Sequence, residues 1–426
     1  MNYRIDSRIL LTVVLASLQA CATGPEPIES PMLFTDNVEL FRRTRFQELA
    51  STEGAKSQSW LKFLNRRKAL SDNHRSILEL RVAYTAGFAK QMSQILSQLP
   101  QQRPAHRLFS ALLENVDLNS PIRHLDYEQD RITLPLNPDY LLRGIPVVKM
   151  TIYGREFSFL WDTGSTENIM SEKLADELEL VLTDVHFPVK RDRDGYVVRI
   201  AAAHTSRLDA DHWKWSNVPW LISDLRMINQ NLNRLNLSID GVLSPQLLVP
   251  QSCFIIDRKK AVLEVFANRE SCVQLRAKKH SISRMYEWNG EIYTSVQIHS
   301  SPLVGARLET GSNATFLRHD AVRYLPAGTL TDSIVQFRGE VARSLDKDIP
   351  LRFAGRVSQM SAIELEASRM TTGHDDLATL GTDLLLQAHD RLWVDFSTMT
   401  LGFLSDDNGL SQPKLGEPGG PKLSQN

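Results

Sequence analysis

Two tetrapeptides carry the residues that could do chemistry. Each follows an apolar run, and they read Asp162-Thr163-Gly164-Ser165 and Glu309-Thr310-Gly311-Ser312. Hydrolysis of an amide by water needs a base that takes the water proton and an acid that protonates the leaving nitrogen. Two carboxyl groups about 3 Å apart cannot both ionise cheaply, so they share one proton and perform both tasks. Asp162 and Glu309 are therefore the candidate catalytic pair.

The elements that must position this pair recur in the same order around both tetrapeptides. The matched features are an apolar pair (Ile169-Met170 and Phe316-Leu317), an apolar crossing segment (Val242-Leu243-Ser244 and Thr379-Leu380-Gly381) and a β-hairpin with an internal acid (254–266 and 392–403). A hairpin is also predicted directly before the first tetrapeptide, from the β-rich runs at 147–152 and 157–161. Four matched features predict two similar β-rich lobes, at 140–275 and 276–405, and not a solenoid.

This layout resembles the pepsin-like and retropepsin-like aspartic proteases over about Gly144 to Leu404. In that family each lobe supplies one strand-borne Asp-Thr-Gly-Ser/Thr loop, and an apolar segment ending in Gly crosses near it. The resemblance implies a mainly β, bilobal pepsin-like fold and an aspartic endopeptidase that acts on a peptide or protein substrate. The sequence departs from the pattern at Glu309, where the family has Asp, and at Ser244, where Gly is usual.

The resemblance also implies supporting roles around the pair. Thr163 and Thr310 are expected to cross-brace the two loops through hydroxyl-to-backbone hydrogen bonds. Ser165 and Ser312 are expected to bond the outer carboxylate oxygens.

The glycines of the tetrapeptides and a predicted hairpin complete the expected site. Gly164 and Gly311 should let each loop turn and approach its partner closely. Asp194-Gly195 between extended runs is a hairpin-turn signal, and Tyr196 is similar in type and rough position to the flap tyrosine of the pepsin-like proteins. The alternative is an exposed hairpin without contact to substrate.

The N-terminus has the pattern of an export signal. Arg4 and Arg8 flank an apolar run at 9–16, which is too short to span a bilayer as a helix. A basic start, a short apolar stretch and small residues predict a signal peptide over residues 1–20.

The end of that signal resembles the lipobox of bacterial lipoproteins. Leu18-Gln19-Ala20-Cys21 carries the resemblance, which implies that Cys21 is lipidated and that residues 21–31 form a linker. Ala22 after the Cys implies an anchor on the periplasmic face of the outer membrane. The alternatives are an uncleaved anchor and a plain signal with a chance Cys.

The remaining cysteines, Cys253 and Cys272, bracket the terminal hairpin of the first lobe. In an oxidising compartment the close ends of this hairpin favour a disulfide between them. The alternative is a pair of buried thiols.

A small helical region is predicted at 32–118. Apolar residues at steps of three and four predict one helix from about Ser71 to Leu99, ended by Pro100, and a second at 106–115. This region either packs against the downstream domain or binds a partner. The tail at 406–426 is rich in Gly, Pro, Ser and Lys, which predicts disorder.

Composition limits the remaining functions. The 426 residues are 42 % hydrophobic and 23 % charged, which excludes a collagen-like, wholly disordered or polytopic membrane chain. The 49 basic and 50 acidic residues give a net charge of −1, so no overall field would attract nucleic acid. The scattered histidines and three cysteines form no H-E-x-x-H or C-x-x-C motif, so no metal and no cofactor are expected. The oligomeric state is left open.

The leading hypothesis is therefore an aspartic endopeptidase-like lipoprotein that uses a water activated by the carboxylates of Asp162 and Glu309. One alternative is a non-catalytic pepsin-like lipoprotein of the cell envelope that binds an extended peptide or protein. Another is a structural lipoprotein whose helical region docks an envelope partner.

Overall fold

A computed structural model describes residues 72–404, apart from 102–103, 115, 153, 185–199, 211–212, 227–228, 230–231, 233–236, 249–251, 277–281, 289–290, 328, 338–339, 346–348, 361–362, 367–375 and 387–390. The predicted signal, the predicted lipidation site Cys21, the linker, the tail and the first part of the predicted helical region (32–71) all lie outside the described residues, as does Tyr196 in the predicted flap hairpin.

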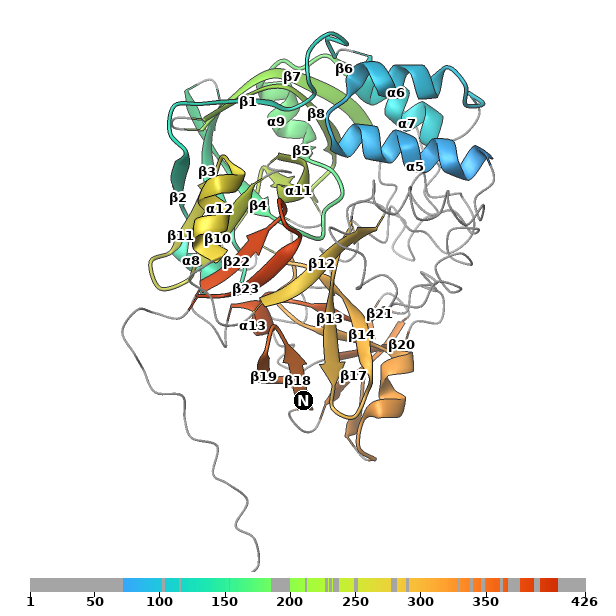
Figure 1. Cartoon of the computed structure of the whole chain (residues 1–426), viewed down its shortest axis with the longest axis vertical. Helices are drawn as coiled ribbons and strands as arrows, with labels where there is room; N and C mark the ends of the chain where they lie inside the picture. The colour runs from blue at the N-terminus through green and yellow to red at the C-terminus, as the bar shows by residue number, and fades with distance from the viewer. Residues whose placement is uncertain are drawn as a thin grey trace, which may run out of the picture.

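Among the described residues, three helices precede the sheets and lie against one side of the first lobe (Figure 1): α5 (Asp72–Thr85), α6 (Ala89–Leu96) and α7 (Pro104–Leu113). The expectation of one helix through to Leu99 is wrong, because the chain breaks at Gly87. Gly87 has φ +80°, and the N–H groups of Gly87 and Phe88 donate to the carbonyls of Tyr84 and Ala83. This is a Schellman C-cap, which favours glycine at the left-handed position.

The first lobe is built on a sheet with the strand order β3-β4-β9-β5-β8-β7-β6, and β1 pairs with β8. Its strands are β1 (His124–Tyr127), β3 (Val147–Ile152), β4 (Arg155–Trp161), β5 (Ile169–Ser171), β6 (Leu182–Asp184), β7 (Ile200–Ala210), β8 (Trp213–Ser223) and β9 (Gly241–Leu243). Short helices lie at α8 (Pro138–Leu141), α9 (Glu172–Glu177) and α11 (Pro245–Leu248).

The second lobe has the strand order β16-β17-β20-β15-β21-β14-β13, and β18 pairs with β13 and β19. Its strands are β13 (Glu291–Ile298), β14 (Leu303–Leu308), β15 (Phe316–Arg318), β16 (Leu330–Phe337), β17 (Glu340–Leu345), β18 (Ile349–Phe353), β19 (Arg356–Met360), β20 (Ile363–Glu366) and β21 (Asp376–Leu380). Two short helices, η1 (His319–Tyr324) and α13 (Thr382–Leu385), follow β15 and β21.

The two lobes repeat the same strand pairings. β4 runs parallel to β9, with Trp161 opposite Leu243, and β14 runs parallel to β21, with Leu308 opposite Leu380. β5 and β15 then pair antiparallel with β9 and β21 from the other side. The repeat predicted from sequence is confirmed, as is the mainly β, pepsin-like fold of two similar lobes behind a small helical region.

A central antiparallel sheet joins the lobes, with the order β2-β11-β10-β22-β23-β12. Its strands are β2 (Arg131–Pro135), β10 (Cys253–Asp257), β11 (Val262–Phe266), β12 (Ile282–Trp288), β22 (Arg391–Asp395) and β23 (Thr400–Phe403). The two predicted terminal hairpins lie side by side, with β10 paired to β22. β1 and β2 fall in residues 119–139, which the sequence prediction assigned to no domain.

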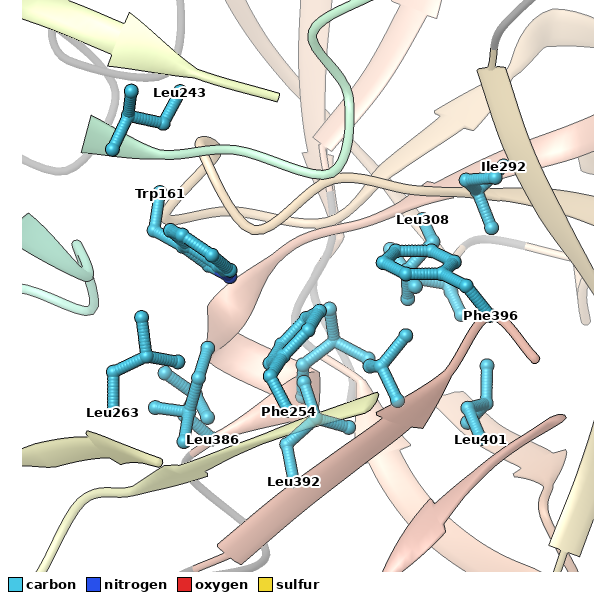
Figure 2. Close-up of a cluster of buried hydrophobic side chains, with 14 of the residues drawn as sticks. Trp161, Leu243, Phe254, Leu263, Ile292, Leu308, Leu386, Leu392, Phe396 and Leu401 are labelled. Atoms are coloured by element: carbon cyan, nitrogen blue, oxygen red, sulfur yellow. The ribbon is translucent and has the colours of Figure 1, made fainter. Parts of the chain in front are cut away.

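One apolar core runs beneath both lobes and this central sheet (Figure 2). Trp161 packs edge-on against Phe254, and Phe254 packs against Phe396, with ring centroids 5.5 and 5.9 Å apart. Leu308 of β14 lies in the same core. Trp161 and Leu308 each directly precede a candidate carboxylate, so burial of both residues fixes where the two loops leave the core.

The predicted disulfide is confirmed. Cys253 at the start of β10 and Cys272 in α12 (Arg269–Arg276) are bonded, with their Cα atoms 5.8 Å apart. No helix within the described part of the chain is long and apolar enough to cross a membrane.

Candidate active site

Matched backbone hydrogen bonds place the two carboxylates at equivalent strand ends. The N–H of Asp162, after β4, donates to the carbonyl of Leu243 at 3.0 Å, and the N–H of Glu309, after β14, donates to that of Leu380 at 3.1 Å. Each tetrapeptide then turns, because its serine N–H donates to the carbonyl of the first residue at 3.2 Å in both loops. The backbones of Asp162 and Glu309 therefore occupy equivalent positions in the two lobes.

Thr163 and Thr310 lock the two loops together. The N–H of Thr163 donates to Oγ1 of Thr310 at 3.0 Å, and the N–H of Thr310 donates to Oγ1 of Thr163 at 3.1 Å. Each hydroxyl then donates across the lobes, to the carbonyl of Leu308 at 3.0 Å and to that of Trp161 at 2.8 Å. These four bonds are fully buried, so the separation of the loops is set by the backbone and not by the carboxylates.

Asp162 is held by the backbone of both loops. Its Oδ1 accepts from the N–H of Gly164 at 2.7 Å and from the N–H of Gly311 at 3.0 Å. A Cβ at Gly311 would lie 2.4 Å from the carboxyl carbon of Asp162, closer than any real contact. Glycine at 311 is therefore required for the second loop to approach the first carboxylate.

Glu309 has a different partner. Its Oε2 accepts from Arg307 at 3.0 Å, and the same guanidinium lies 3.0 Å from Oε1 of Glu291. Glu291 in turn accepts a hydrogen bond from the hydroxyl of Tyr293. The longer side chain of Glu309 thus reaches back along its own strand to a cation, whereas Asp162 is fixed by amides.

Burial raises the pKa of both carboxyl groups, whose residues are only 5 % (Asp162) and 4 % (Glu309) exposed. For Asp162 the amide hydrogen bonds and the charge of Arg307 oppose this rise in pKa. For Glu309 the negative charges of Asp162 and Glu291 add to it, Arg307 opposes it, and the pKa reaches about 7. The carboxyl group of Glu309 therefore keeps its proton to a higher pH than an ordinary glutamate does.

The two tetrapeptide serines differ from expectation. The hydroxyl of Ser165 donates to the carbonyl of Glu167 at 2.6 Å, and the hydroxyl of Ser312 donates to that of Ala314 at 2.7 Å. A hydroxyl has one proton to donate. The expected hydrogen bonds to the outer carboxylate oxygens are therefore absent, and both serines instead brace the turn that follows.

Ser244, at the position where glycine is usual, fits its surroundings. Its hydroxyl donates to the carbonyl of Ser165 at 2.7 Å. In the second lobe the carbonyl of Ser312 accepts from the backbone N–H of Thr382 at 2.8 Å, while the hydroxyl of Thr382 donates to the carbonyl of Gly144. The departure at Ser244 thus supplies a hydrogen bond beneath Asp162 that the other lobe draws from the residue after Gly381.

Sequence reasoning missed three polar residues that shape the site: Arg307, Asn168 and Thr315. Asn168 accepts from the N–H of Ser244 at 2.9 Å, and Thr315 accepts from the N–H of Gly381 at 3.1 Å. Asn168 and Thr315 lie six residues beyond Asp162 and Glu309 respectively, since 168 − 162 = 315 − 309 = 6. A comparison of the two repeats that extended six residues beyond each carboxylate would have found Asn168 and Thr315. Nothing in the repeat marks Arg307.

A groove of about 500 Å³ in the second lobe contains neither carboxylate. It lies between β12, β13 and the β18–β19 hairpin, and its lining includes Arg284, Arg352 and Arg356. Within the described ranges, no group of three His, Cys, Asp or Glu side chains is arranged to hold a metal ion.

A model of a known protein family matches part of the first lobe. Residues 148–244 match the aspartyl protease family model. This match contains Asp162 and its crossing segment, and it ends before the second lobe.

The solved structures that are similar to this chain include two seed globulins, both with low sequence identity. Basic 7S globulin from soybean has 10 % identity and a TM-score of 0.37, covering 64 % of this chain and 94 % of the globulin. Conglutin gamma, a basic 7S globulin from lupine seeds, has 11 % identity and a TM-score of 0.36, covering 66 % of this chain and 96 % of the conglutin. No curated protein sequence matches the chain.

Proposed function

We propose that this protein is an aspartic endopeptidase whose catalytic pair is Asp162 and Glu309. The observation that carries the proposal is the pair of buried carboxylates on matched, cross-braced loops, with the pKa of Glu309 raised to about 7. Scaffolding alone needs neither the buried charges nor the close approach of Gly311 to Asp162. The aspartyl protease match over residues 148–244 supports the same reading of the first lobe.

The asymmetry of the site assigns a role to each carboxyl group. Asp162, whose Oδ1 accepts two amide hydrogen bonds, is the general base that takes a proton from water. The resulting hydroxide attacks the peptide carbonyl carbon while Glu309 gives its proton to the carbonyl oxygen. When the tetrahedral intermediate collapses, the C–N bond breaks and the proton on Asp162 passes to the leaving nitrogen. Glu309 then recovers its proton from the new acid.

The ion pair between Arg307 and Glu309 favours a second candidate function. If this pair holds Glu309 ionised and away from Asp162, the protein would bind an extended peptide beside the two loops without cleaving it, by adding it as a strand. The two candidates differ in one outcome, namely whether bound peptide is cut.

Incubation of the purified full-length protein with a denatured protein mixture, followed by mass spectrometry of the peptides, tests the proposal. We expect new termini with the wild type and with Asp126→Asn, which changes an exposed carboxylate on β1. We expect none with Asp162→Asn. Peptide binding without new termini from acid to neutral pH would overturn the proposal and favour the binding protein.

We also propose that Cys21 anchors the mature protein to the periplasmic face of the outer membrane. The lipobox-like run ending at Cys21 supports this location. The disulfide between Cys253 and Cys272 agrees with an oxidising compartment.

A further inference from the structure

The helical region contacts the first active loop through one buried acid, Glu167, which lies two residues after the tetrapeptide. Arg81 of α5 donates to Oε1 of Glu167 at 2.5 Å, and the hydroxyl of Tyr84, one turn further along α5, donates to Oε2 at 2.6 Å. Glu167 is 3 % exposed and Arg81 is 2 % exposed. The ion pair is therefore shielded from water, unlike the weak ion pairs of a protein surface.

The same helix also holds the backbone of the loop. A second nitrogen of Arg81 donates to the carbonyl of Thr166 at 2.7 Å, and the carbonyl of Glu167 accepts from the hydroxyl of Ser165 at 2.6 Å. Ser165 closes the tetrapeptide that begins with Asp162. Only a few bonds therefore separate α5 from the candidate base.

Tyr84 is itself fixed in place. The guanidinium carbon of Arg123 lies 4.6 Å from the centre of its ring, and Arg123 also donates to the carbonyl of Tyr84. The ring packs edge-on against Phe109 of α7, at 5.3 Å between centroids. The hydroxyl that reaches Glu167 is thus held by the core of the helical region.

The second lobe provides an internal comparison. The residue five positions beyond Glu309 is Ala314, which corresponds to Glu167, five positions beyond Asp162. Its carbonyl accepts the hydroxyl of Ser312, as that of Glu167 accepts the hydroxyl of Ser165. The loop therefore folds with alanine at this position, so the carboxylate of Glu167 is not needed for the turn itself. Its partners are on α5.

We propose that the helical region is a positioning element for the Asp162 loop, and that Arg81, Tyr84 and Glu167 are its positioning residues. The inference rests on the proposed function only where activity is the readout. A loop held at Glu167 keeps the Gly164 N–H and the carboxylate of Asp162 in the geometry that proton transfer requires.

Two conservative variants test this without removing a buried charge. Tyr84→Phe loses one donor to Glu167, and Arg81→Lys keeps the positive charge but loses the forked geometry that holds both Glu167 and Thr166. Met92→Ala is the matched control, because Met92 is fully buried in the same helical cluster but belongs to α6, whereas the contacts with Glu167 come from α5. It should lower the melting temperature without affecting the loop.

Two readouts are measured on the full-length protein: amide hydrogen exchange at residues 162–168, and kcat and KM on one cleaved peptide. We expect Arg81→Lys and Tyr84→Phe to accelerate exchange of the Gly164 amide about tenfold and to lower kcat about tenfold, with KM little changed. Met92→Ala should leave both readouts at the wild-type level.

Unchanged exchange in both loop-contacting variants would overturn the inference, as would equal acceleration in Met92→Ala. If the wild type cleaves no peptide, the proposed function fails, but exchange at Gly164 still decides the positioning role.

Discussion

At the residue scale, the two candidate carboxylates differ in what holds them. Asp162 is fixed by amide N–H groups from both loops, whereas Glu309 bonds to Arg307 on its own strand. One extra methylene allows this difference, because the backbone positions of the two residues are equivalent. The site is thus symmetric in its backbone and asymmetric in its charges.

Arg307 sets the proton affinity of Glu309. Its positive charge lowers the pKa of Glu309 against the rise caused by burial. Arg307→Gln should therefore move that pKa above its present value of about 7, as followed by carbon NMR of glutamate carboxyl groups during a pH titration. Arg155→Gln, which removes an exposed partner of Glu177, is the control. An unmoved Glu309 titration in a folded Arg307→Gln protein would refute this assignment.

The sequence was sufficient to predict that Asp162 and Glu309 lie at equivalent strand ends and that Thr163 and Thr310 bridge the loops, because a repeated motif marks equivalent places in two lobes. It could not predict where flexible polar side chains would turn. The hydroxyls of Ser165 and Ser312 bond to nearby carbonyls and not to the carboxylates. Nothing in the repeat marks Arg307, because the residue at that position differs between the two lobes. Which partner a polar side chain bonds to depends on distances of a few ångströms in the folded protein, and the spacing of residues along the sequence does not give these distances.

At the element scale, the site requires the loops that follow β4 and β14 to approach each other closely. Gly311→Ala places a methyl group 2.4 Å from the carboxyl carbon of Asp162, so the second loop must move away. We expect loss of proteolysis, measured as kcat/KM on a cleaved peptide, by a factor on the order of 100.

Gly154→Ala is the matched control for this substitution. Gly154 has φ +76° with nothing within 4 Å of an added Cβ, so alanine costs about 1 kcal/mol in unfolding free energy through backbone strain. It should leave proteolysis unchanged. Equal losses of activity in both variants would show that the clash at Gly311 is not decisive.

The disulfide ties α12 to the start of β10 in the central sheet. The bond closes a loop with a sequence separation of 19, and Cys253→Ala with Cys272→Ala should lower the free energy of unfolding by about 3 kcal/mol. Urea unfolding of the double variant and the wild type measures this difference. Two free thiols in the non-reduced wild type, found by mass spectrometry, would contradict it.

Element boundaries were harder to predict than element types. Apolar spacing predicted one helix where α5 and α6 are separated at Gly87, because the same periodicity continues on both sides of the break. The local Schellman C-cap at Gly87 ends α5, and a contact distant in sequence supports this break: the N–H of Ile122 donates to the carbonyl of Gly87 at 2.9 Å. The strands before and after the tetrapeptides were predictable because each appears twice.

At the scale of the whole molecule, the central sheet and the hydrogen bonds between Thr163 and Thr310 hold the lobes together. The helical region contacts the first lobe through the hydrogen bonds of α5 to Glu167. The hydrogen bonds from Arg81 and Tyr84 to Glu167 place α5 next to the Asp162 loop. The proposed lipidation site, Cys21, precedes α5 in the sequence.

Cys21→Ser tests the anchor. Without the thiol no thioether to lipid can form, so we expect the variant to leave the membrane fraction and to lack the mass of acyl chains at its N-terminus. Fractionation of cells followed by intact-protein mass spectrometry measures both. A variant that stays in the membrane fraction with an unchanged N-terminal mass would show that Cys21 is not lipidated.

The pH dependence of kcat/KM on a cleaved peptide tests the central claim most directly. A pKa of about 7 keeps the proton on Glu309 below that pH, so the wild-type activity should fall as pH rises through about 7 and the proton is lost. Asp162→Asn and Glu309→Gln should each abolish cleavage at every pH, because the proposed mechanism needs a base at position 162 and a proton donor at position 309. A Glu309→Gln protein with full activity and an unchanged pH profile would contradict the account.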